Sequence, residues 1–429
     1  MDIANATDLY ARADYAGALN AALSAAQAGD AGTALLVAAK CLVALRNFDG
    51  LGKVIGVAQQ HGAALERVFF RILHDCLGDG LYEPLVDLAG VIPDSGILHP
   101  IALYHASCAW MMLGDDATAS DGFDRFRLAM PRFLGVLPVG TDDDFNVMFR
   151  QGTLVLPLVK TAERIADGAH LPSAQGEIEI VRPQDEGPTG PIVLCCADAL
   201  YVEHFLPRWV APLVGLGHSL HVHLIDPGRE SLALIDQVIA EHDLGGRLSV
   251  SVSSDRHHTA TSYACARFET VPALLEAFHR PLVALDIDVA AMPALATLAA
   301  LPFADFGCFE TGRCEPASVH QASIMTFANS AESVAFVRDL SRYCRPKLHQ
   351  PVRVNWMLDQ AALFSVLRLY RATKPGFRYW PLDRLTGRPM SDFVVGLASD
   401  AEKHALKVRS AGLGAGAHSS GTVDFTWEP

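Results

Sequence analysis

Two aspartates separated by one residue, Asp286 and Asp288, directly follow the apolar run 281–285. Such a run is typical of a buried strand, and a bend after it would let both carboxylates reach one cation. Mg²⁺ and Mn²⁺ prefer oxygen ligands and accept substrate phosphates as further ligands. A cation held in this way stabilises a departing diphosphate. The pair therefore predicts a divalent-cation site (Mn²⁺ or Mg²⁺) for a phosphate-bearing substrate.

The elements that must position this pair are those of an α/β domain. Stretches of helical apolar spacing alternate with short apolar runs that indicate strands. This order predicts a mostly parallel sheet with flanking helices, in which ligands bind at the carboxyl ends of strands. Asp198 falls at one such predicted end with Tyr201 just after it, and Asp226 falls at another. Residues 192–196 and 281–285 are apolar runs, whereas apolar residues alternate with polar ones in 220–224 and 248–252.

The segment from Tyr263 to Val289 resembles retaining glycosyltransferases of the GT-A fold, of the glycogenin and lipopolysaccharide galactosyltransferase type. These enzymes have a Tyr-x-Arg-Leu/Phe helix and then a strand that ends in Leu-Asp-Ile/Ala-Asp. Here Cys265 stands in the position of the tyrosine. The resemblance implies that Arg267 contacts the nucleotide sugar. It also implies that Asp286 and Asp288 hold the metal and the ribose or sugar, and it makes Asp198 and Tyr201 candidates for base and ribose.

Two further segments resemble the same enzymes in the same order. Residues 320–327 are similar to their Asn-Ala-Gly-Val-Met-Leu strand, with Gln321 and Ser323 in place of the asparagine and glycine. Residues 356–363 resemble their Asp-Gln-x-x-Leu helix. The resemblance implies that Asp359 binds sugar hydroxyls, that Gln360 lies beside the anomeric carbon, and that Gln321 helps to bind the donor. Their carboxy-terminal His-x-x-Gly-x-x-Lys-Pro-Trp is absent here, so the resemblance supplies no third metal ligand.

The amino-terminal part has a different pattern. It is rich in Ala and Leu at helical spacing, and residues 105–126 resemble a tetratricopeptide repeat, with a plain helical bundle as the alternative. Pro, Gly and charged residues then indicate a linker, in which the short apolar piece at 178–181 could be a strand packed on either domain. The sequence therefore predicts an all-α helical-repeat domain, a linker, a GT-A-like domain and a flexible tail. The four parts are residues 1–170, 171–190, 191–410 and 411–429.

Composition restricts the partners. The formal charge of −14 argues against a general nucleic-acid binder, since such proteins need Lys and Arg to neutralise phosphates. No signal peptide or apolar run long enough for a transmembrane segment is visible, so we expect a cytoplasmic, bacterial-style protein. The nine cysteines, without a C-x-x-C pair, indicate reduced thiols. His257 and His258 read as loop residues, and Asp226 before Pro227 reads as a turn.

The predicted function is a metal-dependent glycosyltransferase that uses a nucleotide-diphospho-sugar donor and retains the sugar's configuration. Its acceptor would be a protein or peptide bound by the helical domain. One alternative is a catalytically inactive scaffold. A second is a haloacid-dehalogenase-type phosphatase, which also uses Asp-x-Asp after a strand, although that strand is normally the first of its domain and three predicted strands precede it here.

Overall fold

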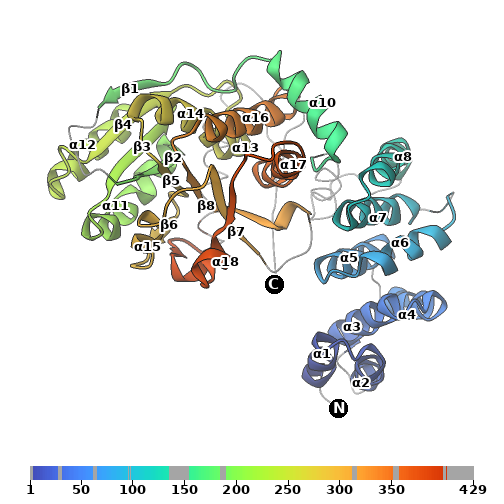
Figure 1. Ribbon diagram of the computed structural model, residues 1–429. Coiled ribbons are helices and arrows are strands. Elements are labelled where there is room, and N and C mark those ends of the chain that lie inside the picture. The colour runs from blue at the N-terminus through green and yellow to red at the C-terminus, as the bar shows by residue number, and fades with distance from the viewer. Residues whose placement is uncertain are drawn as a thin grey trace. The chain divides into compact units, whose positions relative to one another are not determined.

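The computed structural model describes residues 3–27, 31–60, 65–94, 96, 98–134, 154–183, 190–311, 316–350, 357–399 and 402 (Figure 1). The chain divides into two compact units. The helical unit comprises Met1–Pro157 and Gly312–Val319, and the sheet unit comprises Leu158–Thr311 and His320–Pro429. The predicted tail, 411–429, lies outside the described residues.

The helical unit consists of helices in which each packs against its neighbours along the chain. Helix α2 packs against both α1 and α3, and α7 packs against both α6 and α8. The buried face of α2 carries only alanines, and such small side chains let helices approach closely. The described helices are α1 (Ile3–Ala11), α2 (Tyr15–Gln27), α3 (Ala31–Ala44), α4 (Phe48–Gln60), α5 (Leu65–Gly78), α6 (Tyr82–Val91), α7 (His99–Leu113) and α8 (Asp116–Leu134), with the 3-10 turn η1 (Pro316–Ser318).

Helices α7 and α8 form the hairpin that the sequence predicts. Gly114 ends α7 at φ 86°, a left-handed conformation that glycine adopts without strain. Ala119 and Phe123 of α8 are buried. A Cβ on Gly122 would lie 2.3 Å from Oγ of Ser107, so only glycine allows this close approach of the two helices. The hairpin is confirmed, while its assignment to the tetratricopeptide repeats remains a prediction.

The sheet unit is α/β, as predicted. Its eight-stranded sheet has the order β1-β4-β3-β2-β5-β8-β7-β9. Strands β4, β3, β2 and β5 are parallel, and β7 and β9 run the same way because β8 is antiparallel to both β5 and β7. The strands are β1 (Glu179–Arg182), β2 (Ile192–Asp198), β3 (Ser219–Ile225), β4 (Leu248–Ser253), β5 (Leu282–Leu285), β7 (Phe306–Glu310), β8 (His320–Phe327) and β9 (Tyr379–Pro381); β6 (Val289–Ala291) and β10 (Val394–Gly396) form a separate antiparallel pair.

Helices connect the parallel strands and cover the sheet (Figure 1). The core contains Phe205 and Trp209 of α11, packed with the apolar side chains of β2, β3 and β5. The four predicted strands of the parallel core are all present. Strands β2 and β5 contain continuous apolar runs, whereas in β3 and β4 apolar residues alternate with buried polar ones. The helices are α10 (Leu158–Ala169), α11 (Ala199–Gly215), α12 (Arg229–Glu241), α13 (Ala260–Cys265), α14 (Arg267–Phe278), α15 (Leu295–Ala299), α16 (Ala331–Leu348), α17 (Leu358–Thr373) and α18 (Leu382–Thr386), with the 3-10 turn η2 (Met390–Asp392).

Residues 158–183 differ from the prediction of a helical domain to residue 170 followed by a linker. Helix α10 packs against α16 and α17 of the sheet unit. A Cβ on Gly168 would lie 1.8 Å from the carbonyl oxygen of Arg342, so α10 and α16 are in backbone contact there. Strand β1 then pairs antiparallel with β4. The described part of the predicted linker is therefore integrated into the sheet unit.

The described ranges contain neither a candidate membrane span nor a disulfide. No helix within them is long and apolar enough to cross a membrane. The eight cysteines within them are all free thiols, and seven are fully buried, as the sequence indicated.

Candidate functional site

The candidate residues gather at one edge of the sheet. Strands β2, β3, β4 and β5 end at this edge because they are parallel, and β8 begins there because it is antiparallel to β5. Asp198 ends β2 and caps α11, where its carboxylate accepts a hydrogen bond from the Tyr201 N–H over 2.8 Å. Asp286 follows β5, and its N–H donates to the carbonyl oxygen of Ser323 on β8 over 3.1 Å.

Tyr201 shows how close the carboxylates are to one another. Burial raises the pKa of its phenol, and the charges of Asp288, Asp198 and Asp286 raise that pKa further. One aromatic ring therefore lies within electrostatic range of three acidic side chains from two different strand ends. This arrangement brings together four of the residues proposed from the sequence, and it concentrates negative charge that a cation or a set of hydrogen-bond donors would offset.

Arg267 is the main positive charge at this edge. Its Nη1 is 2.7 Å from Oδ1 of Asp286 and donates to the carbonyl oxygen of Ala322 on β8 over 2.8 Å. Its Nε donates to the carbonyl oxygen of Ala264. Burial alone would lower the pKa of Arg267, but the charges of Asp286 and Asp359 outweigh it and raise the pKa overall. The guanidinium thus joins α14, β8 and the end of β5.

Helix α17 contributes the last two candidates. Burial raises the pKa of Asp359, whereas the Arg267 charge lowers it and the Asp286 charge raises it. The next residue is Gln360, whose Oε1 is buried and has no hydrogen-bond partner among the described residues. A buried acceptor without a donor costs about 1–3 kcal/mol, so this amide oxygen is suited to an incoming ligand. Met357 precedes the helix at φ 68°, a conformation that few non-glycine residues adopt.

Gln321 lies on β8 opposite Phe309 of β7, at the edge where β8 begins. It is partly exposed. Its strand also carries Ala322 and Ser323, whose carbonyl oxygens bind Arg267 and the Asp286 N–H. The structure therefore places Gln321 one or two residues from the contacts that fix the centre of the site.

The carboxylate oxygens of the site are ligands of the kind that a hard divalent cation prefers. Asp286 and Asp288 present carboxylates at the same edge, and only one oxygen of Asp286 bonds to Arg267 in the contacts above. Within the described ranges, no group of three or more His, Cys, Asp or Glu side chains has a metal-binding arrangement. A cation held by these two aspartates would therefore need oxygens from the substrate or solvent as its other ligands.

Asp226 belongs to a second polar group that the sequence assigned to a turn and a loop. Oδ2 of Asp226 lies 3.0 Å from Nδ1 of His258 and accepts from the Tyr263 hydroxyl over 3.3 Å. Oδ1 of Asp226 accepts from the N–H of the nearly fully buried Asp255. Asp226 itself has φ 51°. His258 is exposed and lies outside the helices and strands, as predicted for a loop residue, and these contacts join the ends of β3 and β4.

A row of hydrogen-bonded side chains runs along the buried faces of β3 and β4. His221 bonds to Ser249 through Nδ1 and to Ser251 through Nε2, both over 2.7 Å. His223 bonds to Ser251 through Nδ1 over 2.8 Å and to Ser253 through Nε2 over 3.0 Å. We call these five residues the His–Ser row. Alternate spacing of His on β3 and of Ser on β4 is the sequence signal that could have revealed it.

The bonding pattern fixes the direction of every donor in the His–Ser row. Gln175 donates through Nε2 to a carboxylate oxygen of Asp255, so its Oε1 accepts from the Ser253 hydroxyl over 2.8 Å. Ser253 has then used its only proton and must accept from Nε2–H of His223. Because burial lowers the pKa of both histidines to about 3, each is neutral and carries one proton. Both histidines are therefore Nε2–H tautomers, and every bond points toward Asp255.

Comparisons with known proteins give a distant likeness. No protein-family model matches the chain, and no curated protein matches it significantly. Two crystal structures of the glycosyltransferase GlyE from Streptococcus pneumoniae, one of them the apo form, are similar at 16% and 15% identity, each with a TM-score of 0.33. Each covers 50% of this chain and 55% of GlyE. The galactosyltransferase LgtC, in complex with donor and acceptor sugar analogs, is 14% identical over 51% of this chain and 82% of its own, with a TM-score of 0.29.

This chain thus spans about half the length of GlyE. Because all three TM-scores are below 0.5, the function proposed below depends on the residues of the site and their contacts.

Proposed function

We propose that the sheet unit transfers a sugar from a nucleotide-diphospho-sugar to an acceptor. The observation that carries this proposal is the group formed by Arg267, Asp286 and Asp359, followed along α17 by Gln360, whose buried Oε1 has no hydrogen-bond partner among the described residues. A buried cation that bonds to one carboxylate and interacts with a second suits a ligand with both anionic oxygens and hydroxyls. The neutral amide oxygen beside it suits a centre that develops positive charge.

Donor binding would use the edge of the sheet. Tyr201 offers a partly buried ring for the base or ribose, and the carboxylate of Asp198 fixes its helix. Arg267 has a rigid fork of donors suited to phosphate and ribose oxygens. Gln321 supplies an uncharged amide for the sugar or ribose hydroxyls. Asp286 would accept from hydroxyls through the oxygen that is not bonded to Arg267.

A Mg²⁺ or Mn²⁺ ion held by Asp286 and Asp288 would neutralise charge on the departing nucleoside diphosphate. The backbone of Asp288 is fixed, because its carbonyl oxygen accepts a hydrogen bond from the N–H of Leu397. Arg267 restrains Asp286 at the same time, so both carboxylates would be held before the donor binds.

Gln360 would stabilise the sugar during transfer. Bond cleavage at the anomeric carbon gives a transition state that resembles an oxocarbenium ion. An amide oxygen is a poor nucleophile but a good dipole, so Gln360 would stabilise positive charge without a lasting covalent bond. Asp359 would hold sugar hydroxyls. This arrangement favours attack on the face from which the diphosphate leaves, and hence retention of configuration.

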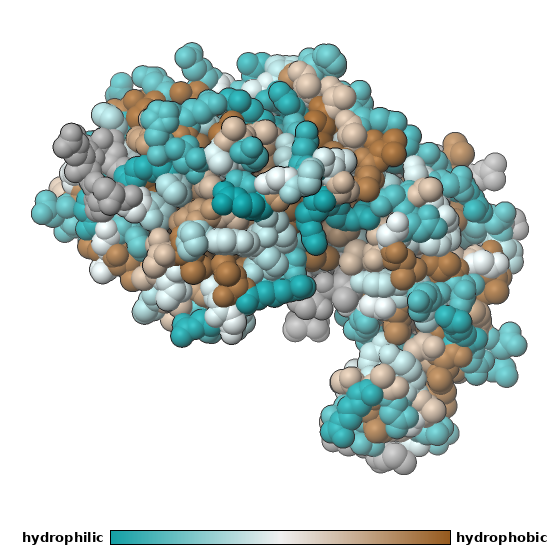
Figure 2. All heavy atoms as spheres, in the orientation of Figure 1, coloured by the Kyte–Doolittle hydropathy of each residue, from teal (hydrophilic) through white to brown (hydrophobic). Residues whose placement is uncertain are grey.

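The helical unit would bind the acceptor, which we propose is a protein or peptide. Helical stacks present extended surfaces that suit polypeptides. A groove of about 490 Å³ in this unit is lined by Phe48 of α4, Phe69 of α5, Leu88 of α6 and Leu98 before α7, among others. Hydrophobic side chains such as Leu45, Val57 and Val91 are also exposed on it, and Figure 2 shows hydrophobic residues on the drawn face of both units.

The test is to offer the full-length protein a panel of nucleotide sugars. A ligand of the folded state raises the melting temperature, and slow hydrolysis of the same compound reports transfer to water. We expect one donor to do both. Binding without turnover would favour the inactive scaffold. Covalent aspartyl phosphate on Asp286 would instead establish the phosphatase, for which the Arg267 contact on Asp286 is an obstacle to nucleophilic attack.

A further inference from the structure

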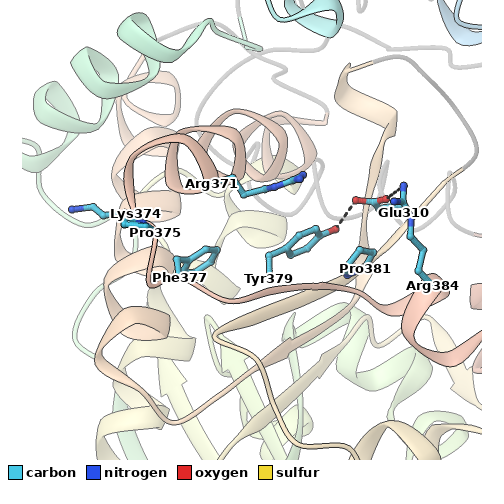
Figure 3. A pocket seen from close by; sticks show the side chains of 8 residues that line it. All are labelled: Glu310, Arg371, Lys374, Pro375, Phe377, Tyr379, Pro381 and Arg384. Carbon is cyan, nitrogen blue, oxygen red and sulfur yellow. Dashed lines mark hydrogen bonds and ion pairs between the residues drawn. The ribbon is translucent and has the colours of Figure 1, made fainter.

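A separate pocket of about 420 Å³ lies on the sheet unit between β9, α17 and α18. This volume falls within the roughly 300–1,000 Å³ that is usual for small-molecule sites. Figure 3 shows its lining as a row, with Lys374 at one end, Arg384 at the other, and Arg371 and Tyr379 between them. The remaining lining residues are Glu310, Pro375, Phe377 and Pro381.

The lining is positively charged although the chain carries a formal charge of −14. It has three basic side chains and one acidic one. Glu310 offsets Arg384, since their side chains lie 2.9 Å apart. Arg371 lies with its guanidinium 5.8 Å from the centre of the Tyr379 ring. Within the described residues, no acidic side chain forms an ion pair with Arg371 or Lys374, both of which line the pocket.

Partly buried polar contacts hold the wall of the pocket in place. The Tyr379 hydroxyl donates to Oε1 of Glu310 over 3.0 Å, and it lies 3.6 Å from Sγ of Cys308. The N–H of Glu310 donates to Asp383 at the start of α18. Burial and then the Arg371 charge lower the pKa of His320 on β8 to about 4. His320 is therefore neutral, and the positive charge that an anion would meet comes from Arg371 and Lys374. The wall is therefore preorganised and not a chance gathering of mobile side chains.

The pocket and the proposed donor site lie at the same edge of the sheet, because Glu310 ends β7 at the edge where β8 begins. Glu310 pairs with His320 across β7 and β8, and the following residue of β8 is Gln321. Apolar faces from Phe377, Pro375 and Pro381 line the same space as the basic groups. Such a combination suits a molecule with an anionic group attached to a ring or a carbon chain.

We infer that this pocket binds a phosphate or carboxylate group of the acceptor. The identification of the bound molecule as the acceptor depends on the proposed glycosyl transfer, but binding of an anion to the pocket can be measured without that reaction. The protein or peptide acceptor would then carry this anionic group, held by Arg371 and Lys374 so that the reactive hydroxyl faces the edge of the sheet. Positive charge in this pocket, on a chain whose formal charge is −14, would also favour acidic molecules over neutral ones.

The test measures binding of inorganic phosphate by ³¹P NMR and of citrate by calorimetry to the full chain. The variant is Arg371→Gln with Lys374→Gln, both exposed positions at which folding should be retained and can be checked by circular dichroism. Arg338→Gln is the matched control, because it removes one positive charge from an exposed pair with Glu276 on another surface. We expect at least one anion to bind saturably, with affinity reduced tenfold or more in the double variant and unchanged in the control.

The outcomes separate the two proposals. Binding of phosphate alone would indicate a phosphorylated acceptor, and binding of citrate alone would indicate a carboxylate. Equal affinity in the double variant, or no saturable binding to the wild-type protein, would overturn the inference. Displacement of the anion by nucleoside diphosphate alone would also overturn it, since the anion would then occupy the donor site. Anion binding with no donor binding or hydrolysis would leave the pocket assignment in place and refute the transfer reaction.

Discussion

Nε2 of Gln175 donates a hydrogen bond to Oδ1 of Asp255 over 3.1 Å, although the two residues are 80 positions apart. Gln175 belongs to the segment before the parallel sheet, and Asp255 follows β4. The same amide accepts from Ser253, so it sets the donor direction throughout the His–Ser row. The contact therefore ties the segment at 171–183 to the edge of the sheet where Asp226 and His258 meet.

The His–Ser row predicts a loss of stability in acid. The pKa of His221 and of His223 is lowered to about 3 by burial, whereas an unfolded histidine titrates near 6.5. Between these values the unfolded chain binds more protons, so the free energy of unfolding rises with pH and is lost as pH falls from about 7 toward 3. From pH 7 to pH 5 we expect a loss of roughly 2 kcal/mol for each histidine.

Urea unfolding of His223→Gln at the two pH values checks this. The variant should be less stable at pH 7 but should lose about 2 kcal/mol less on acidification, because one titrating group is gone. His170→Gln, at an exposed position, is the control and should lose as much as the wild-type protein. An acid sensitivity identical in all three proteins would contradict the neutral, buried assignment.

Arg267→Ala should abolish donor binding and also lower stability. Removal of one partner from a largely buried ion pair leaves the other uncompensated, and we expect a cost of about 2–4 kcal/mol. Lys347→Ala should have little effect on either quantity. Calorimetry with the nucleotide sugar and thermal unfolding provide the two measurements. Unchanged donor affinity in a folded Arg267→Ala protein would assign the arginine a structural role alone.

Asp288→Asn should abolish transfer while the fold persists. The side chain lies at a ligand-facing strand end and contributes little to core packing, so the melting temperature should change by only a few degrees. The check is hydrolysis of the donor with and without EDTA. An active Asn variant, together with wild-type activity that EDTA does not reduce, would refute the metal proposal.

Gln360→Ala should lower kcat about 10²-fold with a small effect on the affinity for the donor, because the amide acts on charge that develops only during the reaction. Gln360→Glu is the informative companion. A carboxylate there would sit near Asp359 and Asp286, so it should weaken donor binding as well. Pre-steady-state measurement of donor hydrolysis separates the two effects. Equal reductions in binding and turnover for Gln360→Ala would assign the residue to ground-state binding.

The boundary of the sheet unit can be tested with two fragments. A fragment that starts at Leu158 keeps α10, β1 and the Gln175 contacts, and it should be soluble and bind the donor. A fragment that starts at Pro191 lacks all three. It exposes the edge of β4 and leaves Asp255 and Ser253 without their amide partner, so we expect aggregation or a large loss of stability. Equal behaviour of the two fragments would restore the predicted linker.

Much of the sheet could be predicted because each strand of its parallel core has either a continuous apolar run or apolar residues at alternate positions. Strand β8 was predicted over 320–327 and is found there. Asn329 and Ser330 both precede α16, and it is Ser330 that caps the helix by accepting from the Ser333 N–H. Both residues are good caps, and only the backbone geometry decides between them.

The short apolar piece at 178–181 indicated a strand, and β1 is found at Glu179–Arg182, but neither its partner strand nor the His–Ser row was predicted. Pro, Gly and charged residues around this piece are typical of linkers, yet β1 pairs with β4 of the sheet unit. The polar side chains of Ser249 and Ser251 read as the exposed face of a strand, whereas they are buried because His221 and His223 satisfy them. Pairing between distant residues decided both features.

Gly168 lies on α10, in the outer layer of the sheet unit, and is linked to the site through the contacts of α16. A methyl group there would meet the backbone of Arg342 on α16 and would force α10 and α16 apart. Three residues further along α16, Arg345 forms a two-pronged bond to Glu269 of α14. Helix α14 begins with Arg267 itself. A displacement of α16 caused by one added carbon atom at Gly168 would therefore also shift Glu269 and α14. It would thereby shift the Arg267 guanidinium that bonds to Asp286.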